Sequence, residues 1–420
     1  MNILLLGNGF DLAHKRPTKY KDFIYFCCAL EKIYSYAGDV KLSEYKEKCK
    51  ELEYLNPHLK SLLINAYEGR KCERIIKDDG TYKDKIIGLD NSFDELHGML
   101  VDNAWFEYFK NCDSLGEGWI DFESEIAKII NVLNELKNNR EKSLGDDSLL
   151  YSQLELAQML INYDSWEGLS ELGYYDNYTF VTRLEKDLDR IIRALEIYLA
   201  RILCYVPEDF KLKEITDLEI SRVLSFNYTD TFYRLYDENK DIQYCYIHGK
   251  AKGLSAVDTC NMVLGINEFL PDELADKDMT FVYFKKYYQR IYKSTGAEYL
   301  EWVEEIQQDL WKEKMHLSTL YEQDKFFDIE RLKNREYTRV SNLYIFGHSL
   351  DVTDKDVLKA LICNDNVQTH IFYYRETHDD RRTLKKLVAN LAKVIGPEEL
   401  IRRTGGTDKT IEFIPQTVES

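Results

Sequence analysis

No run of apolar residues in this sequence approaches the roughly 20 that a membrane-spanning helix requires. The nine cysteines include no C-x-x-C pair, so neither a zinc ribbon nor a disulfide framework is expected, and the thiols should be reduced and mostly buried. Basic residues are fewer than acidic ones, since 56 Lys and Arg against 74 Asp and Glu give a net charge of −18. This balance disfavours nonspecific nucleic-acid binding, although it leaves room for a local basic groove.

What is present indicates a globular protein, since hydrophobic residues make up 44% and charged residues 31% of the 420 positions. That length suits one large domain with insertions, or two or three domains of ordinary size. The first apolar run, Ile3–Leu6, is short and follows no basic segment, which is typical of a strand and not of a signal peptide. A cytoplasmic location without a membrane partner is therefore expected.

Short apolar runs rich in Val, Ile, Phe and Tyr are scattered along the chain. They predict strands at Ile3–Leu6, Val223–Phe226, Gln243–Ile247, Met262–Leu264, Leu343–Phe346, His370–Tyr374 and Ile411–Ile414. Fully apolar strands of this length suit a parallel sheet covered on both faces. Helical spacing of apolar residues follows from Phe122 to Leu136, from Leu184 to Leu199, and over about 279–313.

The resulting prediction is an α/β fold with a Rossmann-like, mostly parallel sheet and large helical insertions. The sheet is expected from residues 1–30, 215–270 and 335–415. Residues 31–214 and 271–334 are expected as two helical insertions, acting as a lid or an interaction surface.

The first strand runs into Gly7-Asn8-Gly9-Phe10-Asp11. The two glycines permit a tight turn and a close backbone approach to a ligand, and a following helix would attract phosphate. A plain strand-to-helix turn stays open as the alternative, because the third glycine of the dinucleotide fingerprint is absent. Asp11 and His14 follow the turn, where Asp11 either caps the helix or contacts the ligand.

Polar residues also follow three later strands. Asn227 and Thr229 follow one, His248-Gly249 the next, and Gly347-His348-Ser349 a later one. Because ligands of parallel α/β sheets bind at the carboxyl ends of strands, these residues are candidates for one site. Asn227 suits a sugar hydroxyl or a water, or else caps a helix. His248 is a candidate general base, with a structural histidine as the alternative.

In order along the chain, these motifs resemble the bacteriophage abortive infection AbiH family. The resemblance rests on Gly7 through His14, Trp119–Glu123, Asn227-Tyr228-Thr229, His248-Gly249 and Gly347 through Asp351. It implies phage defence by shutdown of the infected cell, without supplying a reaction. Asp121 and Glu123 either stabilise a helix start or reach from it into the site.

The same elements look more distantly like a sirtuin-type NAD-binding core. Gly7, Gly9 and Pro17 keep the spacing of the sirtuin glycine turn and its proline, His248-Gly249 is similar to the catalytic H-G, and Gly347 through Leu350 to G-T-S-L. Asn227 matches the asparagine of the Q-N-I-D segment, but Thr229 replaces its acidic residue. Since the zinc-binding cysteines of deacetylases are missing, the resemblance implies NAD cleavage with water as acceptor.

The sequence thus leads to the hypothesis of an NAD⁺ hydrolase that releases nicotinamide and ADP-ribose and needs no metal. The pyrophosphate would rest on the Gly7–Phe10 backbone, Asn227 would hold ribose and water, His248 would be the base, and Asp11 would stabilise the oxocarbenium ion. The rivals are a non-catalytic NAD or ADP-ribose sensor that signals through its insertions, and a nucleic-acid-directed effector. A phage trigger, a partner protein or a homo-oligomer is compatible with each.

Overall fold

The computed structural model describes most of the chain. The described residues are 1–36, 40–76, 82–87, 90–112, 121–139, 179–208, 210–239, 241–266, 279–322, 340–377, 380–406 and 409–416. They divide into two compact units, a core unit of Met1–Arg16, Glu208–Lys250 and Ser294–Ser420, and a helical unit of Pro17–Pro207 and Ala251–Lys293. The candidate residues after the four strands all lie in the core unit.

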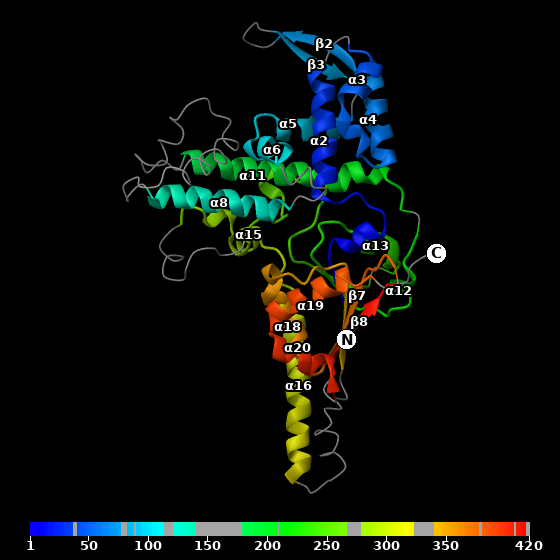
Figure 1. Cartoon of the computed structure of the whole chain (residues 1–420), viewed down its shortest axis with the longest axis vertical. Helices are drawn as coiled ribbons and strands as arrows, with labels where there is room; N and C mark the ends of the chain where they lie inside the picture. Colours follow the sequence, from blue (N-terminus) through cyan, green and yellow to red (C-terminus); the bar gives the residue numbers. More distant parts are fainter. Residues whose placement is uncertain are drawn as a thin grey trace. The chain divides into compact units, whose positions relative to one another are not determined.

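A parallel sheet organises the core unit (Figure 1). Its strands are β1 (Asn2–Leu6), β4 (Arg222–Ser225), β5 (Gln243–Tyr246), β6 (Ser341–Phe346), β7 (Val367–Tyr373) and β8 (Ile411–Pro415). They stand in the order β5-β4-β1-β6-β7-β8, and each neighbouring pair is parallel. Numbered by themselves along the chain, they follow the 3-2-1-4-5-6 order of the doubly wound dinucleotide fold. The α/β prediction and its helical insertions are confirmed.

Both faces of this sheet are covered, as the apolar strands predict. In β1, Ile3 and Leu5 join one hydrophobic cluster while Leu4 and Leu6 join another, because successive side chains of a strand point to opposite faces. The first cluster contains residues of α16 (Tyr299–Glu322), α18 (Lys355–Ile362), α19 (Arg382–Ile395) and α20 (Pro397–Thr404). The second contains residues of α1 (Gly9–Ala13), α12 (Lys213–Thr216) and α13 (Thr231–Tyr236).

The helical unit has few strands in its described part. Its elements are α2 (Tyr20–Ser35), α3 (Leu42–Lys48), α4 (Pro57–Gly69), β2 (Lys71–Ile76), β3 (Tyr82–Ile87), α5 (Asn91–Leu100), α6 (Ala104–Lys110), α8 (Phe122–Asn139), α11 (Thr179–Ile197), the π-helix η2 (Tyr198–Ile202) and α15 (Lys286–Tyr292). The predicted helical stretches from Phe122 and from Leu184 are confirmed as α8 and α11. The antiparallel β2–β3 hairpin was not predicted.

One predicted strand is wrong. Met262–Leu264 is buried but belongs to no strand. The Gln289 side chain takes the place of a neighbouring strand, since its Oε1 accepts from Leu264 N at 3.0 Å and its Nε2 donates to Leu264 O at 3.0 Å. A side chain of α15 therefore satisfies the backbone that the apolar pattern assigned to a sheet.

The stretch around 279–313, predicted as one helical region, divides between the units. α15 belongs to the helical unit, whereas α16 belongs to the core unit, where Trp302, Val303 and Ile306 are buried. The two helices are separated near Gly296, whose positive φ and close approach to Ile247 suit glycine alone. Residues 17–30 and 251–266, which were predicted within the segments that supply the sheet, lie in the helical unit.

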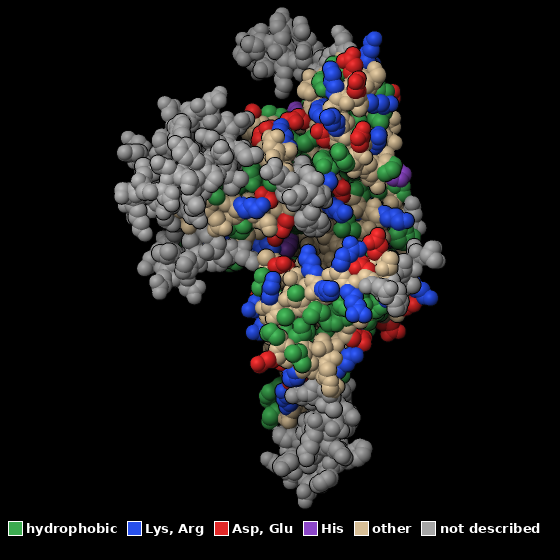
Figure 2. Space-filling view, viewed as in Figure 1, with side chains coloured by type: hydrophobic (Ala, Val, Ile, Leu, Met, Phe, Trp, Pro, Cys, Tyr) green, Lys and Arg blue, Asp and Glu red, His purple; other side chains and the backbone are tan. Residues whose placement is uncertain are grey.

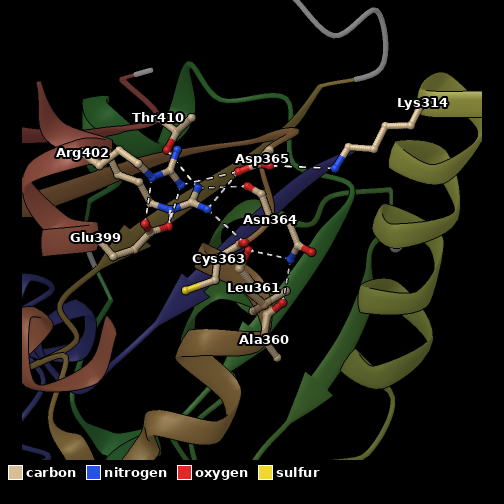
Figure 3. Close-up of polar contacts among 10 residues, drawn as sticks. Lys314, Ala360, Leu361, Cys363, Asn364, Asp365, Glu399, Arg402 and Thr410 are labelled. Carbon is tan, nitrogen blue, oxygen red and sulfur yellow. Dashed lines mark hydrogen bonds and ion pairs between the residues drawn. The ribbon is translucent and has the colours of Figure 1, made fainter. Parts of the chain in front are cut away.

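At the amino ends of β7 and β8, the buried guanidinium of Arg403 joins three segments. Its Nε donates to Glu399 at 2.6 Å, and its other nitrogens donate to Cys363 O, Asn364 O, Asp365 and Thr410 at 3.0 to 3.2 Å. Figure 3 shows Glu399, Asp365 and Thr410 converging on this point. All the donor nitrogens of the group are thereby satisfied, which is the condition for burying a charge at low cost.

Among the described residues, no helix is long and apolar enough to cross a membrane.

Candidate functional site

The carboxyl ends of β1, β4, β5 and β6 form one edge of the sheet, here called the carboxyl edge. The segments that follow these strands are Gly7–Gly9, Asn227, His248-Gly249 and Gly347–Ser349. Because neighbouring strands are parallel, all four segments emerge at this same edge. β1 and β6 are adjacent, and the chain proceeds in opposite directions from them, so their ends form the topological switch point where such folds bind ligands.

The glycines at the switch point are required by the chain's own backbone. A Cβ on Gly347 would lie 2.2 Å from Phe10 N, and one on Gly9 would lie 2.7 Å from Gly347 Cα. Gly347 also has a φ of +70° and accepts a 2.9 Å hydrogen bond from Gly9 N. The N–H groups of Gly7 and Phe10 donate to Phe346 O and Gly7 O. The three N–H groups that were proposed to bind a pyrophosphate therefore donate hydrogen bonds to backbone carbonyl groups of the protein.

Asn227 is hydrogen-bonded to this turn. Its Nδ2 donates to Gly7 O at 3.0 Å, and its backbone N–H donates to the Ser225 hydroxyl at 3.1 Å. The Oδ1 atom is buried and has no hydrogen-bond partner. A buried amide oxygen without a partner costs free energy unless a ligand or water satisfies it. The asparagine therefore ties β4 to β1 and keeps one acceptor unused.

His248 and His348 both face the carboxylate of Asp354. Asp354 Oδ1 is 3.8 Å from His248 Nε2, and its Oδ2 is 3.4 Å from His348 Nε2. The Phe226 ring packs against both imidazoles, with ring centroids 5.5 Å and 4.4 Å away. Two histidines from strands on opposite sides of β1 and one acid are thus brought together, an arrangement able to accept and pass a proton.

The loop after β6 fixes the tautomer of His348. Leu350 N donates to His348 Nδ1 at 2.9 Å, so the proton of a neutral imidazole sits on Nε2, toward Asp354. Leu350 holds this position with a φ of +54°, which is unfavourable for a residue with a side chain. Asn390 of α19 holds the same loop by donating to Ser349 O at 2.9 Å. Strain of this kind gathers at functional sites.

Asp11 is buried beside the carboxyl edge, and only 1% of its surface is exposed. Burial raises the pKa of its carboxyl group, opposed by the hydrogen bond from the Thr229 hydroxyl and by the charges of Arg16 and Arg234. The Thr229 bond to Oδ2 is 2.7 Å long, and Oδ1 has no partner. Thr229 and Asp11 therefore form a pair linking the ends of β4 and β1, with the carboxylate below the surface.

His14 and Phe10 lie in the hydrophobic interior. His14 Nδ1 is 2.8 Å from Phe10 O and its Nε2 is 2.7 Å from the Tyr236 hydroxyl. Burial lowers the pKa of His14, and its ring stacks on Phe210. Phe10 packs against Phe232 and Phe346. Both ring nitrogens of His14 are engaged within the protein, and its ring lies next to Phe10.

Exposed side chains lie close to the switch point. Asn8 and Ser349 are exposed next to the Gly9–Gly347 contact, and Gly249 turns the chain after His248 with a φ of +77°. Just beyond, Lys250 Nζ is 3.2 Å from Asp230 Oδ2. Side chains that a ligand could reach and the two buried histidines thus occupy one edge.

The sequence did not identify Asp354 as a site residue. In the structure Asp351 caps the turn by accepting from Thr353 N at 3.1 Å, and Asp354 faces the histidines. The acidic residues that follow Gly347, after the end of β6, were the sequence signal that could have identified Asp354.

Of the Trp119–Glu123 motif, Trp119 lies outside the described residues. Asp121 accepts from Glu123 N, and Glu123 pairs with Lys286 at 2.8 Å in the helical unit.

Charge on the visible surface is mixed. Figure 2 shows Lys and Arg interspersed with Asp and Glu over the described part of that face. Within the described ranges, no group of three or more His, Cys, Asp or Glu is placed to hold a metal ion.

Comparison with known proteins identifies one family. The family described as AbiH, Bacteriophage abortive infection AbiH, matches residues 3–374. This range contains β1 through β7 and the whole carboxyl edge. No curated protein and no solved structure matches the chain.

Proposed function

The chain belongs to the bacteriophage abortive infection AbiH family, and from this premise we propose that it is an antiphage effector that hydrolyses NAD⁺. Family membership implies a role in abortive infection. The reaction goes beyond what family membership implies. Water attacks the ribose carbon that carries nicotinamide, the C–N bond breaks, and nicotinamide, ADP-ribose and a proton are released. Loss of NAD⁺ would stop metabolism in an infected cell.

The observation that carries the proposal is the pair of histidines around Asp354 at the switch point of a 3-2-1-4-5-6 sheet. A nucleotide at the carboxyl ends of parallel strands is the usual occupant of such a position. The distant resemblance of the sequence motifs to a sirtuin core implies the same ligand and the same histidine, although no solved structure matches the chain. The missing zinc-binding cysteines favour water over a protein lysine as the acceptor.

In this proposal the residues divide the chemistry. His248 accepts the proton from the attacking water or a ribose hydroxyl, while Asp354 holds the imidazole and stabilises its positive charge. Asn227 offers its unused Oδ1 to a water or a ribose hydroxyl. Asp11 was the first candidate to stabilise the oxocarbenium ion, but it is buried, and Asp354 is the carboxylate beside the histidines. Exposed Asn8 and Ser349 then contact the phosphates.

The test measures nicotinamide and ADP-ribose by chromatography after incubation of the purified chain with NAD⁺, and cellular NAD⁺ during phage infection. His248→Ala is expected to reduce turnover by about 10² to 10⁴, the usual cost of losing a general base. Asp354→Asn should lower it by a smaller factor. His370→Ala is the matched control, because this half-buried histidine stacks on Tyr344 of β6, away from the switch point.

A folded His248→Ala variant that turns over as fast as wild type would disprove the catalytic role. NAD⁺ or ADP-ribose binding by calorimetry, without product either in vitro or in infected cells, would establish the sensor instead. Binding of DNA or RNA in gel shifts at stated salt, with no response to NAD⁺, would favour the nucleic-acid-directed effector.

A further inference from the structure

The helix α16 carries apolar side chains on two faces. Tyr299, Trp302, Val303 and Ile306 are buried in the core unit. On a different face, Leu300, Trp311 and Met315 are 50%, 63% and 49% exposed. With about 100° of rotation per residue, these three fall on one narrow stripe roughly opposite the buried face. A surface helix needs only one apolar stripe to pack on its own protein, so the second one calls for a partner.

Charge is distributed unevenly along this helix. The exposed acids Glu301 and Glu304 lie in its first turns, while the exposed base Lys312 lies near Trp311. Lys312 Nζ is 3.9 Å from Asp309 Oδ1, which is a loose pair. In the described residues, Glu301 and Glu304 make no ion pair. Two acidic side chains therefore lie beside one end of the stripe and the basic Lys312 lies beside the other, so these charges are complementary in an inverted copy.

We propose that α16 is a self-association surface on which two copies of this chain pair in antiparallel fashion about a twofold axis. If the axis passes between Gln307 and Gln308, Leu300 of one copy lies level with Met315 of the other, and Glu304 lies level with Trp311. Lys312 then falls within two residues, or about 3 Å along the axis, of Glu301 and Glu304 in the second copy. Each contact occurs twice, as an isologous interface requires.

The stripe is short, so the dimer is weak and its population depends on concentration. Stable interfaces bury about 1,200 Å² or more, and one pair of helices with three apolar residues per copy supplies less. Trp311 is the most exposed member and lies near the centre, where aromatic residues dominate binding. The expected assembly is therefore a reversible dimer governed by one tryptophan.

Sedimentation equilibrium of the full chain, from about 1 to 100 µM, tests this surface over the affinities expected for so small an interface. Wild type should fit a monomer–dimer equilibrium, and Trp311→Glu should raise the dissociation constant by about 30-fold or more. Ile401→Glu is the matched control, because Ile401 is 71% exposed on α20 of the same unit and lies outside the stripe.

A charge exchange tests the antiparallel arrangement. Lys312→Glu alone should weaken the dimer, and adding Glu301→Lys and Glu304→Lys to it should restore association. A wild type that stays monomeric throughout the range overturns the proposal. So does an Ile401→Glu variant that weakens association as much as Trp311→Glu, or a triple variant that fails to recover it. Thermal unfolding of each variant verifies that the core unit stays folded.

Discussion

The buried Arg403 cluster and the carboxyl edge of the core sheet differ in how far their buried polar groups are satisfied. At the amino ends of β7 and β8, Arg403 is buried and every nitrogen of its guanidinium has an acceptor. At the carboxyl edge, the Oδ1 atoms of Asp11 and Asn227 are buried without a partner. Two histidines also face Asp354 there at distances longer than an ordinary hydrogen bond.

This difference distinguishes a cluster that stabilises the fold from an edge arranged for a ligand. Satisfied buried networks make a fold rigid, whereas unsatisfied groups and left-handed residues such as Leu350 cost stability and persist where function requires them. The Arg403 cluster should therefore contribute strongly to the free energy of unfolding, and the carboxyl edge should tolerate side-chain changes that alter binding. Its backbone contact at Gly347 is the exception, because there the two β-strand ends touch.

The largest effect is expected from Gly347→Ala. The added Cβ would meet Phe10 N at 2.2 Å on a backbone with a φ of +70°, so crowding and the left-handed conformation both oppose it. Together they should lower the free energy of unfolding by about 2 to 5 kcal/mol in urea titrations.

Gly406→Ala is the control for that substitution, because Gly406 has a φ of +69° and open space around it. Only the conformational cost of about 1 to 2 kcal/mol should appear there. Equal losses in the two variants would mean that β1 and β6 do not touch as described.

Arg403→Met should come next. Removing the guanidinium leaves the carbonyl groups of Cys363 and Asn364 without their donor and takes one of the basic partners of Glu399 and Asp365, at a cost of about 3 kcal/mol in the free energy of unfolding. Arg402→Met is the matched variant, since Arg402 binds the same Glu399 but is partly exposed, and its loss should cost about 1 kcal/mol or less. If both variants lost the same stability, the Arg403 cluster would not be the satisfied network described above.

The smallest effect should appear as a pH dependence at Asp11. Burial raises the pKa of this carboxyl group in the folded state, so between its unfolded and folded pKa values the folded protein binds more protons than the unfolded one. Its contribution to stability is therefore present below about pH 4 and lost as the pH rises through the folded pKa.

The measurement is the difference in free energy of unfolding between wild type and Asp11→Asn, from about pH 4 to 8. Wild type should lose stability relative to the variant as the pH rises, because asparagine cannot ionise. A relative gain by wild type over this range would contradict the raised pKa.

Much of the core could be predicted from local patterns. Buried parallel strands are continuous apolar runs, and β1, β4, β5, β6, β7 and β8 were recognised by that property. Met262–Leu264 has the same pattern and failed, because Gln289 of α15 bonds its backbone. Nothing local to Met262–Leu264 reveals a side chain that arrives from a later helix.

The sequence predicted that the candidate residues lie at one edge of the sheet, but it did not predict which side chains contact one another there. Polar residues after parallel strands meet at one edge, so Asn227, His248 and His348 were expected together. Asp354 was missed as their partner. Gly7 and Gly9 have the Gly347 backbone as a close neighbour and His14 packs on Phe210, and the contacts proposed between these residues and a ligand stay predictions.

Local patterns were enough to predict a parallel α/β sheet with polar strand ends, because strand formation and apolar burial depend on neighbouring residues. The fold was needed to learn that Asp354 stands between two histidines, that Asp11 is buried and that α16 carries a second apolar stripe. Burial and close approach are set by residues far apart in the chain, and a linear pattern contains no measure of those distances.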